Sequence, residues 1–285
     1  MQPRYPILLL LLVIFGCSPA VITRLNWQSA PVVADGRLTE WQAPLRFYDP
    51  DTKLNYVVSN DKENLYVCIR AADEQSQMKI IRGGMQVWID TTGKKKKQVG
   101  ISFPLSAKMR TNDGEESPSE FKRSEKPNME RLHKKITDEA NEMLLTGFKQ
   151  PLNGYTARQN TSGLKLSINW DTNNIMIYEA IIPFSTFYKP TLTNADSLKT
   201  FGFSIVVNGL AAPERKDDGG SGGANMGGGG MGGGGGMSGN RGGMGGGMGG
   251  GRGMGGGGMR GGGGAPSNPM YETNSFWIRF RLASK

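Results

Sequence analysis

The chain has 285 residues, a net charge of +9 and 43 Gly, most of which lie in one block between residues 219 and 264. Outside that block and the N-terminal leader, roughly 200 residues remain, enough for one domain with a hydrophobic core of its own. Two Cys are too few for a disulfide framework. Some of the positive charge lies in the leader and the glycine block, so the remaining domain is only mildly basic.

The leader, residues 1–16, predicts a signal peptide. Its apolar run, residues 7–16, is too short to cross a bilayer as a helix. The run ends in Ile-Phe-Gly-Cys at residues 14–17, which resembles the lipobox of bacterial lipoproteins, although Leu is commoner at its first position. The resemblance implies that Cys17 is lipidated and becomes the first mature residue of a membrane-anchored envelope protein, expected in the outer membrane. A conventional signal peptide with an incidental Cys is the alternative.

We expect residues 17–30 to be a tether and residues 31–285 to form a single domain. The other cysteine, Cys68, lies in the stretch NLYVCIRAAD, which is typical of a β-strand. If Cys17 carries lipid, Cys68 has no partner for an intrachain disulfide. A buried structural thiol is therefore the expected state of Cys68.

Short apolar runs at hairpin spacing predict a mostly β protein, an antiparallel β-sandwich of the immunoglobulin-like or jelly-roll-like kind. The predicted hairpins span residues 54–73, 85–104 and 164–184, and two further strands are expected at 200–210 and 276–282. Residues 85–90 alternate apolar and polar side chains. One face of this strand is therefore apolar, and the other carries Gln86, Trp88 and Asp90.

One amphipathic helix is expected within an insert at residues 105–150. Residues 127–147 place apolar side chains near helical spacing, and Gly147 suits a helix end. A polar loop at residues 106–126 leads into this helix. The single histidine, His133, is expected to be solvated on its polar side, because no second His or Cys lies nearby to complete a metal site.

Five motifs in order resemble the family 9 carbohydrate-binding modules and their DOMON-like relatives. They are VVADGRLTEWQAP (32–44), NDKENLYVCIRAAD (60–73), GMQVWIDTTG (84–93), NIMIYEAIIPFSTF (174–187) and FGFSIVVNG (201–209), followed by an aromatic-rich closing strand. The resemblance covers residues 32–282 and implies a β-sandwich that binds poly- or oligosaccharide through aromatic rings and polar side chains. No catalytic domain is attached, and none of the family's binding aromatics can be carried over residue by residue.

The candidate carbohydrate-binding residues are Trp88, Gln86, Asp90 and Trp277. Both tryptophans alternate away from the apolar face of their strands. An aromatic ring flanked by polar groups suits a sugar, because a pyranose offers C–H faces that pack on a ring and hydroxyls that need partners. The alternative is that each tryptophan packs under a loop or the helix. Trp41 is expected in the core.

No catalytic function is expected, because no carboxylate pair is marked for glycoside hydrolysis and no Ser-His-Asp or phosphate-loop pattern occurs. We expect no cofactor, with a structural calcium ion left open, no metal site and no nucleic-acid partner. The run Lys94–Lys97 is expected to be a solvated turn. Contact of this run with an anionic glycan or a lipid headgroup is the less favoured alternative.

The Gly/Met-rich block is expected to be a disordered loop in a second insert, residues 213–270, before the last strand. Lengthening a connection to this extent costs only about 2 kcal/mol of closure entropy. A neutral loop is the favoured interpretation. Capture of Cu(I) or Ag(I) by the Met thioethers comes second, and nucleic-acid binding by the Arg-Gly-Gly segments comes third.

Two hypotheses for the whole protein remain. The favoured one is a non-catalytic envelope lipoprotein whose sandwich binds carbohydrate. The other is a structural or interaction subunit of an envelope complex, with a protein partner and no sugar ligand. A sugar module exposes at least one tryptophan on its surface, whereas such a subunit buries its outer-face aromatics under the helix or a partner.

Overall fold

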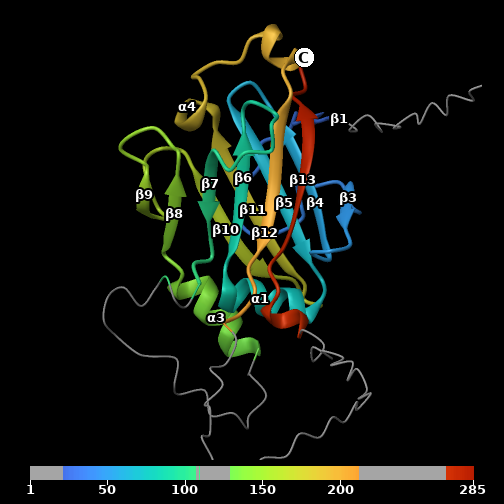
Figure 1. The fold of residues 1–285 in the computed structure, drawn as a ribbon, viewed down its shortest axis with the longest axis vertical. Helices are drawn as coiled ribbons and strands as arrows, with labels where there is room; N and C mark the ends of the chain where they lie inside the picture. The colour runs from blue at the N-terminus through green and yellow to red at the C-terminus, as the bar shows by residue number, and fades with distance from the viewer. Residues whose placement is uncertain (1–21, 107–108, 110–128, 212–267) are drawn as a thin grey trace, which may run out of the picture. The chain divides into compact units, whose positions relative to one another are not determined.

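The structure is a computed structural model that describes residues 22–106, 109, 129–211 and 268–285. These residues form two β-sheets packed face to face, with α1 and α3 at one end of the sandwich and α4 at the other (Figure 1). Neighbouring strands pair antiparallel, except that β1 pairs with β13 and β2 pairs with β4 in parallel. The predicted mostly β sandwich is confirmed.

The seven-stranded sheet, called sheet A below, carries most of the second half of the chain. In spatial order its strands are β1 (Ile22–Arg24), β13 (Asn274–Arg281), β12 (Phe201–Val207), β6 (Met85–Asp90), β7 (Val99–Ser102), β8 (Glu142–Thr146) and β9 (Gly154–Ala157). The closing strand β13 therefore lies between β12 and the first strand of the chain.

The six-stranded sheet, called sheet B, is built around two hairpins. In spatial order its strands are β10 (Lys165–Trp170), β11 (Met176–Pro183), β5 (Asn64–Ala71), β4 (Leu54–Asn60) and β2 (Asn26–Trp27), with β3 (Phe47–Asp49) also paired to β4. The hairpin turn after β10 falls at Asp171–Asn174, where it was predicted.

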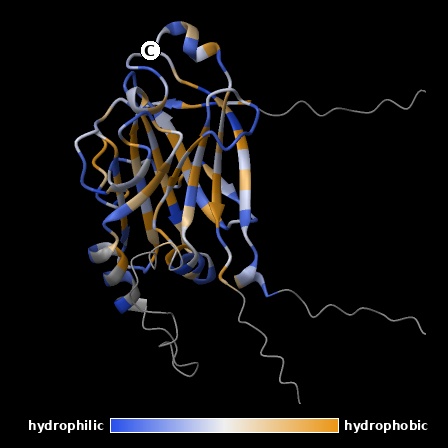
Figure 2. Ribbon diagram, turned by 60° about the vertical axis from the view of Figure 1, so that its left-hand side comes forward, coloured by the Kyte–Doolittle hydropathy of each residue, from blue (hydrophilic) through white to orange (hydrophobic). Residues whose placement is uncertain are grey.

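The main core lies between the two sheets. Alternate residues of every long strand point inward, so Phe201, Phe203 and Ile205 of β12 are all fully buried. Figure 2 shows the hydrophobic residues concentrated on the strands. Because this inner face is apolar in both sheets, the sandwich is fixed by burial of the alternating side chains.

The outer face of sheet B is covered by the chain itself. A second cluster of buried apolar residues packs there, contributed by the segment before β3 and by the outward positions of β4, β5 and β11: Val32, Trp41, Leu45, Val57, Tyr66, Cys68, Ile177 and Ile181. Trp41 is 8 % exposed, and Cys68 is a fully buried free thiol. Both predictions are confirmed, and burial raises the pKa of the Cys68 thiol well above its usual range.

The helices differ from the prediction. A ten-residue helix, α1 (Glu74–Gly83), was not expected; Asp73 caps it by accepting a hydrogen bond from Ser76 N. The predicted helix at 127–147 is shorter, because α3 ends at Glu139 and the chain continues as β8. In β8 Met143 and Leu145 point inward with strand alternation, so Met143, which was assigned to the helix together with Leu144, belongs to a strand.

The remaining elements close the end of the sandwich opposite α1 and α3, or flank β13. They are α4 (Phe184–Phe187), the 3-10 turn η3 (Asn194–Leu198) and the 3-10 turn η4 (Pro269–Tyr271). The N-terminal boundary also moves. Residues 22–27, expected in the tether, form β1 and β2 and pair with both sheets, so the domain includes them.

Several predictions lie outside the described residues. These are the signal peptide at 1–16, lipidation of Cys17, all but residues 106 and 109 of the polar loop at 106–126, and the Gly/Met-rich block at 219–264. Among the helices that the structure describes, none has the length and apolarity needed to cross a membrane.

Candidate functional site: a tryptophan pair on the outer face of sheet A

Two tryptophans lie in one row on the outer face of sheet A. Ser204 of β12 pairs with Trp88 of β6 on one side and with Trp277 of β13 on the other. Paired residues point to the same face of a sheet, so the two indoles flank Ser204, about 10 Å apart across two strand spacings. Both tryptophans are half-exposed, whereas Ser204 between them is fully buried. We call Gln86, Trp88, Ser204 and Trp277 the tryptophan platform.

The Trp88 ring lies over β7. A Cβ added to Gly100 would stand 2.5–2.7 Å from three carbons of the six-membered ring of Trp88, so only glycine leaves room for the indole there. The indole N–H donates a 2.9 Å hydrogen bond to Gln86 Oε1. The ammonium of Lys97, which is exposed, lies 5.5 Å from the centroid of the Trp88 ring. Gly100, the Gln86 amide and the Lys97 ammonium together hold this indole against the sheet.

Trp277 is held by a similar but looser arrangement. Its ring approaches the position of a Cβ on Gly202 to 3.3 Å. The next outward residue of β13, Arg279, pairs with Gly202. Within the described part of the chain, Arg279 Nε and Ser204 Oγ are buried without a hydrogen-bond partner. The surface around Trp277 therefore contains polar groups that the fold itself leaves unsatisfied.

Asp90 takes a different place from the one predicted. It shares the outward parity of Gln86 and Trp88, but its side chain is fully buried at the start of the β6–β7 turn. The carboxylate accepts hydrogen bonds from Thr92 N, Thr92 Oγ1 and Lys96 N. Burial by itself raises the pKa of Asp90, but these hydrogen bonds outweigh it and hold the pKa below its usual range. Asp90 orders the turn and is not open to a ligand.

Two of the other three tryptophans, Trp41 and Trp170, serve the fold. The Trp41 indole donates to buried Glu179. Trp170 stacks on His133 with ring centroids 4.0 Å apart and donates to Gln77. The prediction that His133 is a solvated surface residue is therefore wrong, because its ring packs α3 onto the end of β10.

Two concave sites near Trp27 are the alternatives to the tryptophan platform. A groove of about 500 Å³ lies beside Trp27 and Trp41 on the sheet B side. Part of its polar lining is satisfied internally, since Arg46 donates to Asn26 and Ser59 donates to Gln28. Of its two tryptophans Trp41 is buried, so the groove presents one accessible indole where the tryptophan platform presents two.

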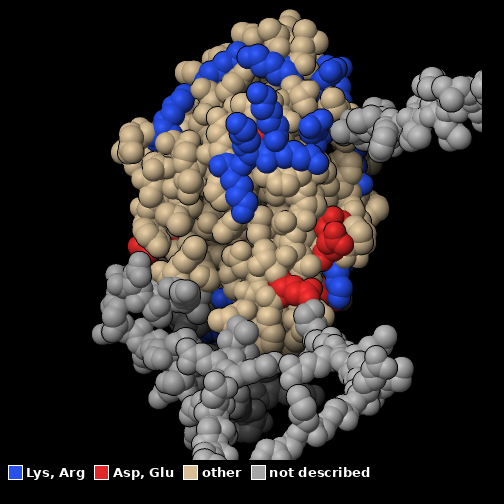
Figure 3. All heavy atoms as spheres, in the orientation of Figure 1, with Lys and Arg blue, Asp and Glu red and all other residues tan. Residues whose placement is uncertain are grey.

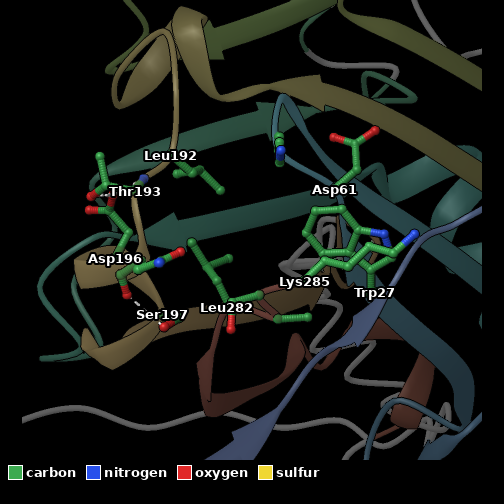
Figure 4. A pocket seen from close by; sticks show the side chains of 12 residues that line it. Trp27, Asp61, Leu192, Thr193, Asp196, Ser197, Leu282 and Lys285 are labelled. Atoms are coloured by element: carbon green, nitrogen blue, oxygen red, sulfur yellow. Dashed lines mark hydrogen bonds between the residues drawn. The ribbon is translucent and has the colours of Figure 1, made fainter.

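The second concave site is much smaller. Its volume is about 40 Å³, and Figure 4 shows Trp27 and Asp61 on one side and Leu192, Thr193 and Asp196 on the other. The Asp196 carboxylate is held by Thr193, Tyr188 and two lysines. This space admits a few waters and not a sugar ring.

The described residues contain no group of three or more His, Cys, Asp or Glu side chains arranged to hold a metal ion. Of the four platform residues only Ser204 carries a hydroxyl group, and its side chain is fully buried. The chemistry available there is aromatic stacking, hydrogen bonding and positive charge.

Comparison with known proteins adds the following. No family model matches the chain, and no curated protein sequence matches it. Two solved structures of a family 9 carbohydrate-binding module from Caldicellulosiruptor kristjanssonii, one in complex with glucose and one with cellotriose, are similar to it. They share 10 % and 11 % identity, cover 68 % and 67 % of this chain and 80 % and 78 % of theirs, and give TM-scores of 0.33 and 0.32. Both belong to the family that the order of the sequence motifs resembles.

Proposed function

We propose that this protein is a non-catalytic carbohydrate-binding lipoprotein of the cell envelope, and that sugar binds on the tryptophan platform. The observation that carries the proposal is the pair Trp88 and Trp277, half-exposed in one row on a sheet face. On sheet B the outward Tyr66 is buried in the cluster formed with residues 31–45, whereas sheet A keeps these two rings accessible. Accessible aromatics on a sheet face favour a binding surface over a purely structural subunit.

The platform offers the two kinds of contact that a pyranose requires. The indole rings provide apolar surface for the C–H faces of sugar units. Hydroxyl groups find donors in the Gln86 amide nitrogen and the Trp277 indole N–H, neither of which makes a hydrogen bond within the described part of the chain. A ligand that spans both rings satisfies these groups.

The envelope location rests on the leader. The signal-peptide-like run and the lipobox-like residues 14–17 place a lipidated Cys17 five residues before β1. A sandwich tethered so close to the membrane would hold polysaccharide next to the cell surface or in the periplasm.

The test is a glycan-array screen of the full chain, followed by calorimetry on the ligands found. Trp88→Ala and Trp277→Ala should each weaken binding by roughly tenfold or more, since a stacked ring contributes about 1–3 kcal/mol. Tyr48→Ala is the matched control, because Tyr48 is 59 % exposed on β3 of the other sheet.

The results of this screen distinguish sugar binding on the tryptophan platform from a site on sheet B and from an interaction subunit. Loss of affinity in both tryptophan variants, with unchanged melting temperatures and an unaffected Tyr48→Ala variant, supports the platform. If no glycan binds the full chain, the sugar hypothesis is abandoned in favour of an interaction subunit. If the Tyr48→Ala variant alone loses binding, the site lies on sheet B.

A further inference from the structure

A rigid basic turn stands over the tryptophan platform. Lys94–Lys97 are all exposed between β6 and β7. The buried Asp90 carboxylate fixes this turn through Thr92 and Lys96, and a Cβ on Gly93 would clash with Thr200 O at 2.8 Å. These contacts therefore hold the turn in the conformation that places Lys97 over the Trp88 ring.

A second cation flanks the platform on the opposite side. Arg279 is half-buried next to Trp277 and carries a guanidinium group. No carboxylate of the described residues forms an ion pair with it. Its Nε atom is buried and lacks a hydrogen-bond partner there. An unpaired, partly desolvated guanidinium is a position where an anion binds favourably.

The charges around the platform are predominantly positive. Figure 3 shows Lys and Arg gathered over the upper part of β6, β12 and β13, with the acidic residues of this view lying lower. Two residues beyond Arg279, the exposed Arg281 lies opposite the exposed Arg24 in the register of β13 and β1. Asp90 is the acid on this face nearest to Trp88, but its carboxylate is committed to the turn. The exposed lysines and arginines therefore leave the surface around the platform positively charged.

We propose that the tryptophan platform selects acidic polysaccharides, with carboxylate or sulfate groups on sugar units that stack on Trp88 and Trp277. This inference rests on the proposed function and names its substrate class. A neutral sugar must displace the Lys97 ammonium from the Trp88 face and gains no ion pair in return. An acidic sugar keeps that ammonium as an ion-pair partner and supplies an acceptor to Arg279.

The shape of the platform favours a glycan over a lipid surface. The Trp88 indole lies against Gly100 and does not project from the sheet. Bilayer binding instead relies on apolar side chains that enter the headgroup region. A flat ring bordered by cations suits a ligand that stacks and pairs at the same time.

The first experiment compares two ligands that share one sugar backbone and differ chiefly in charge. Polygalacturonate and its methyl ester are titrated into the full chain carrying Cys17→Ser, which lacks the thiol that would hold the lipid. We expect polygalacturonate to bind at least roughly tenfold more tightly at low salt, and the advantage to shrink as NaCl is raised, because salt screens exposed charges. Dextran sulfate, a glycan that carries sulfate and no carboxylate, is titrated in parallel and distinguishes sulfate from carboxylate recognition.

The second experiment removes the cations singly. Arg279→Gln should weaken polygalacturonate binding by roughly tenfold, and Lys97→Gln, in a more exposed position, by about two- to fivefold. Neither should weaken binding of the methyl ester. Lys165→Gln is the control, since Lys165 is exposed on β10 of the other sheet. Melting curves of each variant exclude misfolding. Lys97 lies on a solvated turn, so Lys97→Gln should test the charge without changing the stability of the fold.

The outcomes separate the inference from the proposed function. Equal, salt-independent binding of acidic and neutral glycans overturns the acidic preference and leaves carbohydrate binding in place. Absence of binding to every glycan overturns both. Binding of phosphatidylglycerol vesicles that is tighter than polygalacturonate binding, and lost in Lys97→Gln, overturns the glycan assignment in favour of a membrane surface.

Discussion

The indole N–H of Trp41 donates a 2.5 Å hydrogen bond to Oε1 of Glu179, and this contact joins the first and fourth sequence motifs. The other carboxylate oxygen accepts from the backbone N–H groups of Asp35 and Gly36. Glu179 is fully buried, and its pKa is raised by burial although these hydrogen bonds oppose the shift. One carboxylate thus anchors the segment that covers the outer face of sheet B.

Replacing Glu179 by Gln should therefore destabilise the protein. The amide keeps one acceptor but turns a donor toward N–H groups that now bond to a carboxylate oxygen. We expect the free energy of unfolding to fall by about 1–3 kcal/mol. Urea denaturation measures it, with Glu142→Gln on the exposed edge of β8 as the control. An unchanged midpoint would show that the covering segment does not depend on this contact.

Glycine at position 100 should be needed for the platform more than for the fold. In Gly100→Ala the new methyl group would stand 2.5 Å from a Trp88 ring carbon, so the indole must lift off β7. Sugar affinity should fall severalfold, with a change of about 1–3 kcal/mol in stability at most. Gly202→Ala is the graded control, because its nearest contacts are 3.2–3.3 Å. Equal effects of the two variants would contradict the geometry at Trp88.

Asp90 should stabilise the basic turn in a pH-dependent way. Its pKa is lowered in the folded protein, so its contribution is present above the unfolded pKa, near 3.9, and is lost as pH falls through the folded pKa. Asp90→Asn should cost about 1–2 kcal/mol at pH 7. The difference in the free energy of unfolding between Asp90→Asn and the parent protein should be smaller at pH 3. Urea titrations at both pH values measure it, and a constant difference would refute the electrostatic account.

Deletion of residues 219–264 should leave the sandwich folded. The flanks already meet, since Leu210 N donates to Met270 O at 2.8 Å, so a short turn can join them. Stability should be equal or higher by up to about 2 kcal/mol, because a shorter connection closes at lower entropic cost. If the Met residues capture Cu(I), the intact chain should compete with bathocuproine and the deletion should not. Failure of the deletion variant to fold would exclude a neutral connection.

Substitution of Cys17 by Ser should release the protein from membranes. The lipobox-like sequence makes this thiol the expected site of the lipid, and the acyl chains would supply the anchoring free energy. Cell fractionation followed by immunoblotting measures the distribution. Retention of the variant in the membrane pellet would remove lipidation as the anchor.

Local patterns in the sequence were sufficient for much of the sandwich. The alternation in 85–90 predicted that Trp88 and Gln86 face away from the core, and the apolar run around Cys68 predicted a buried thiol. The prediction was wrong where the same apolar residues fitted both the helical and the strand period. Met143 was predicted to lie in a helix, but it lies in β8. Helix α1 carried its own signal, the N-cap Asp73 before an apolar stretch, which went unrecognised between two strong hairpins.

The sequence alone determined which side of each strand is apolar, because that alternation repeats every two residues and involves only neighbours in the chain. Tertiary structure decided which strands stand side by side. Only the pairing of β12 with both β6 and β13 brings Trp88 and Trp277 to opposite sides of Ser204. It also decided that Asp90 turns into the β6–β7 connection and that residues 31–45 cover sheet B. These contacts join residues far apart in the chain, and no local pattern encodes their partners.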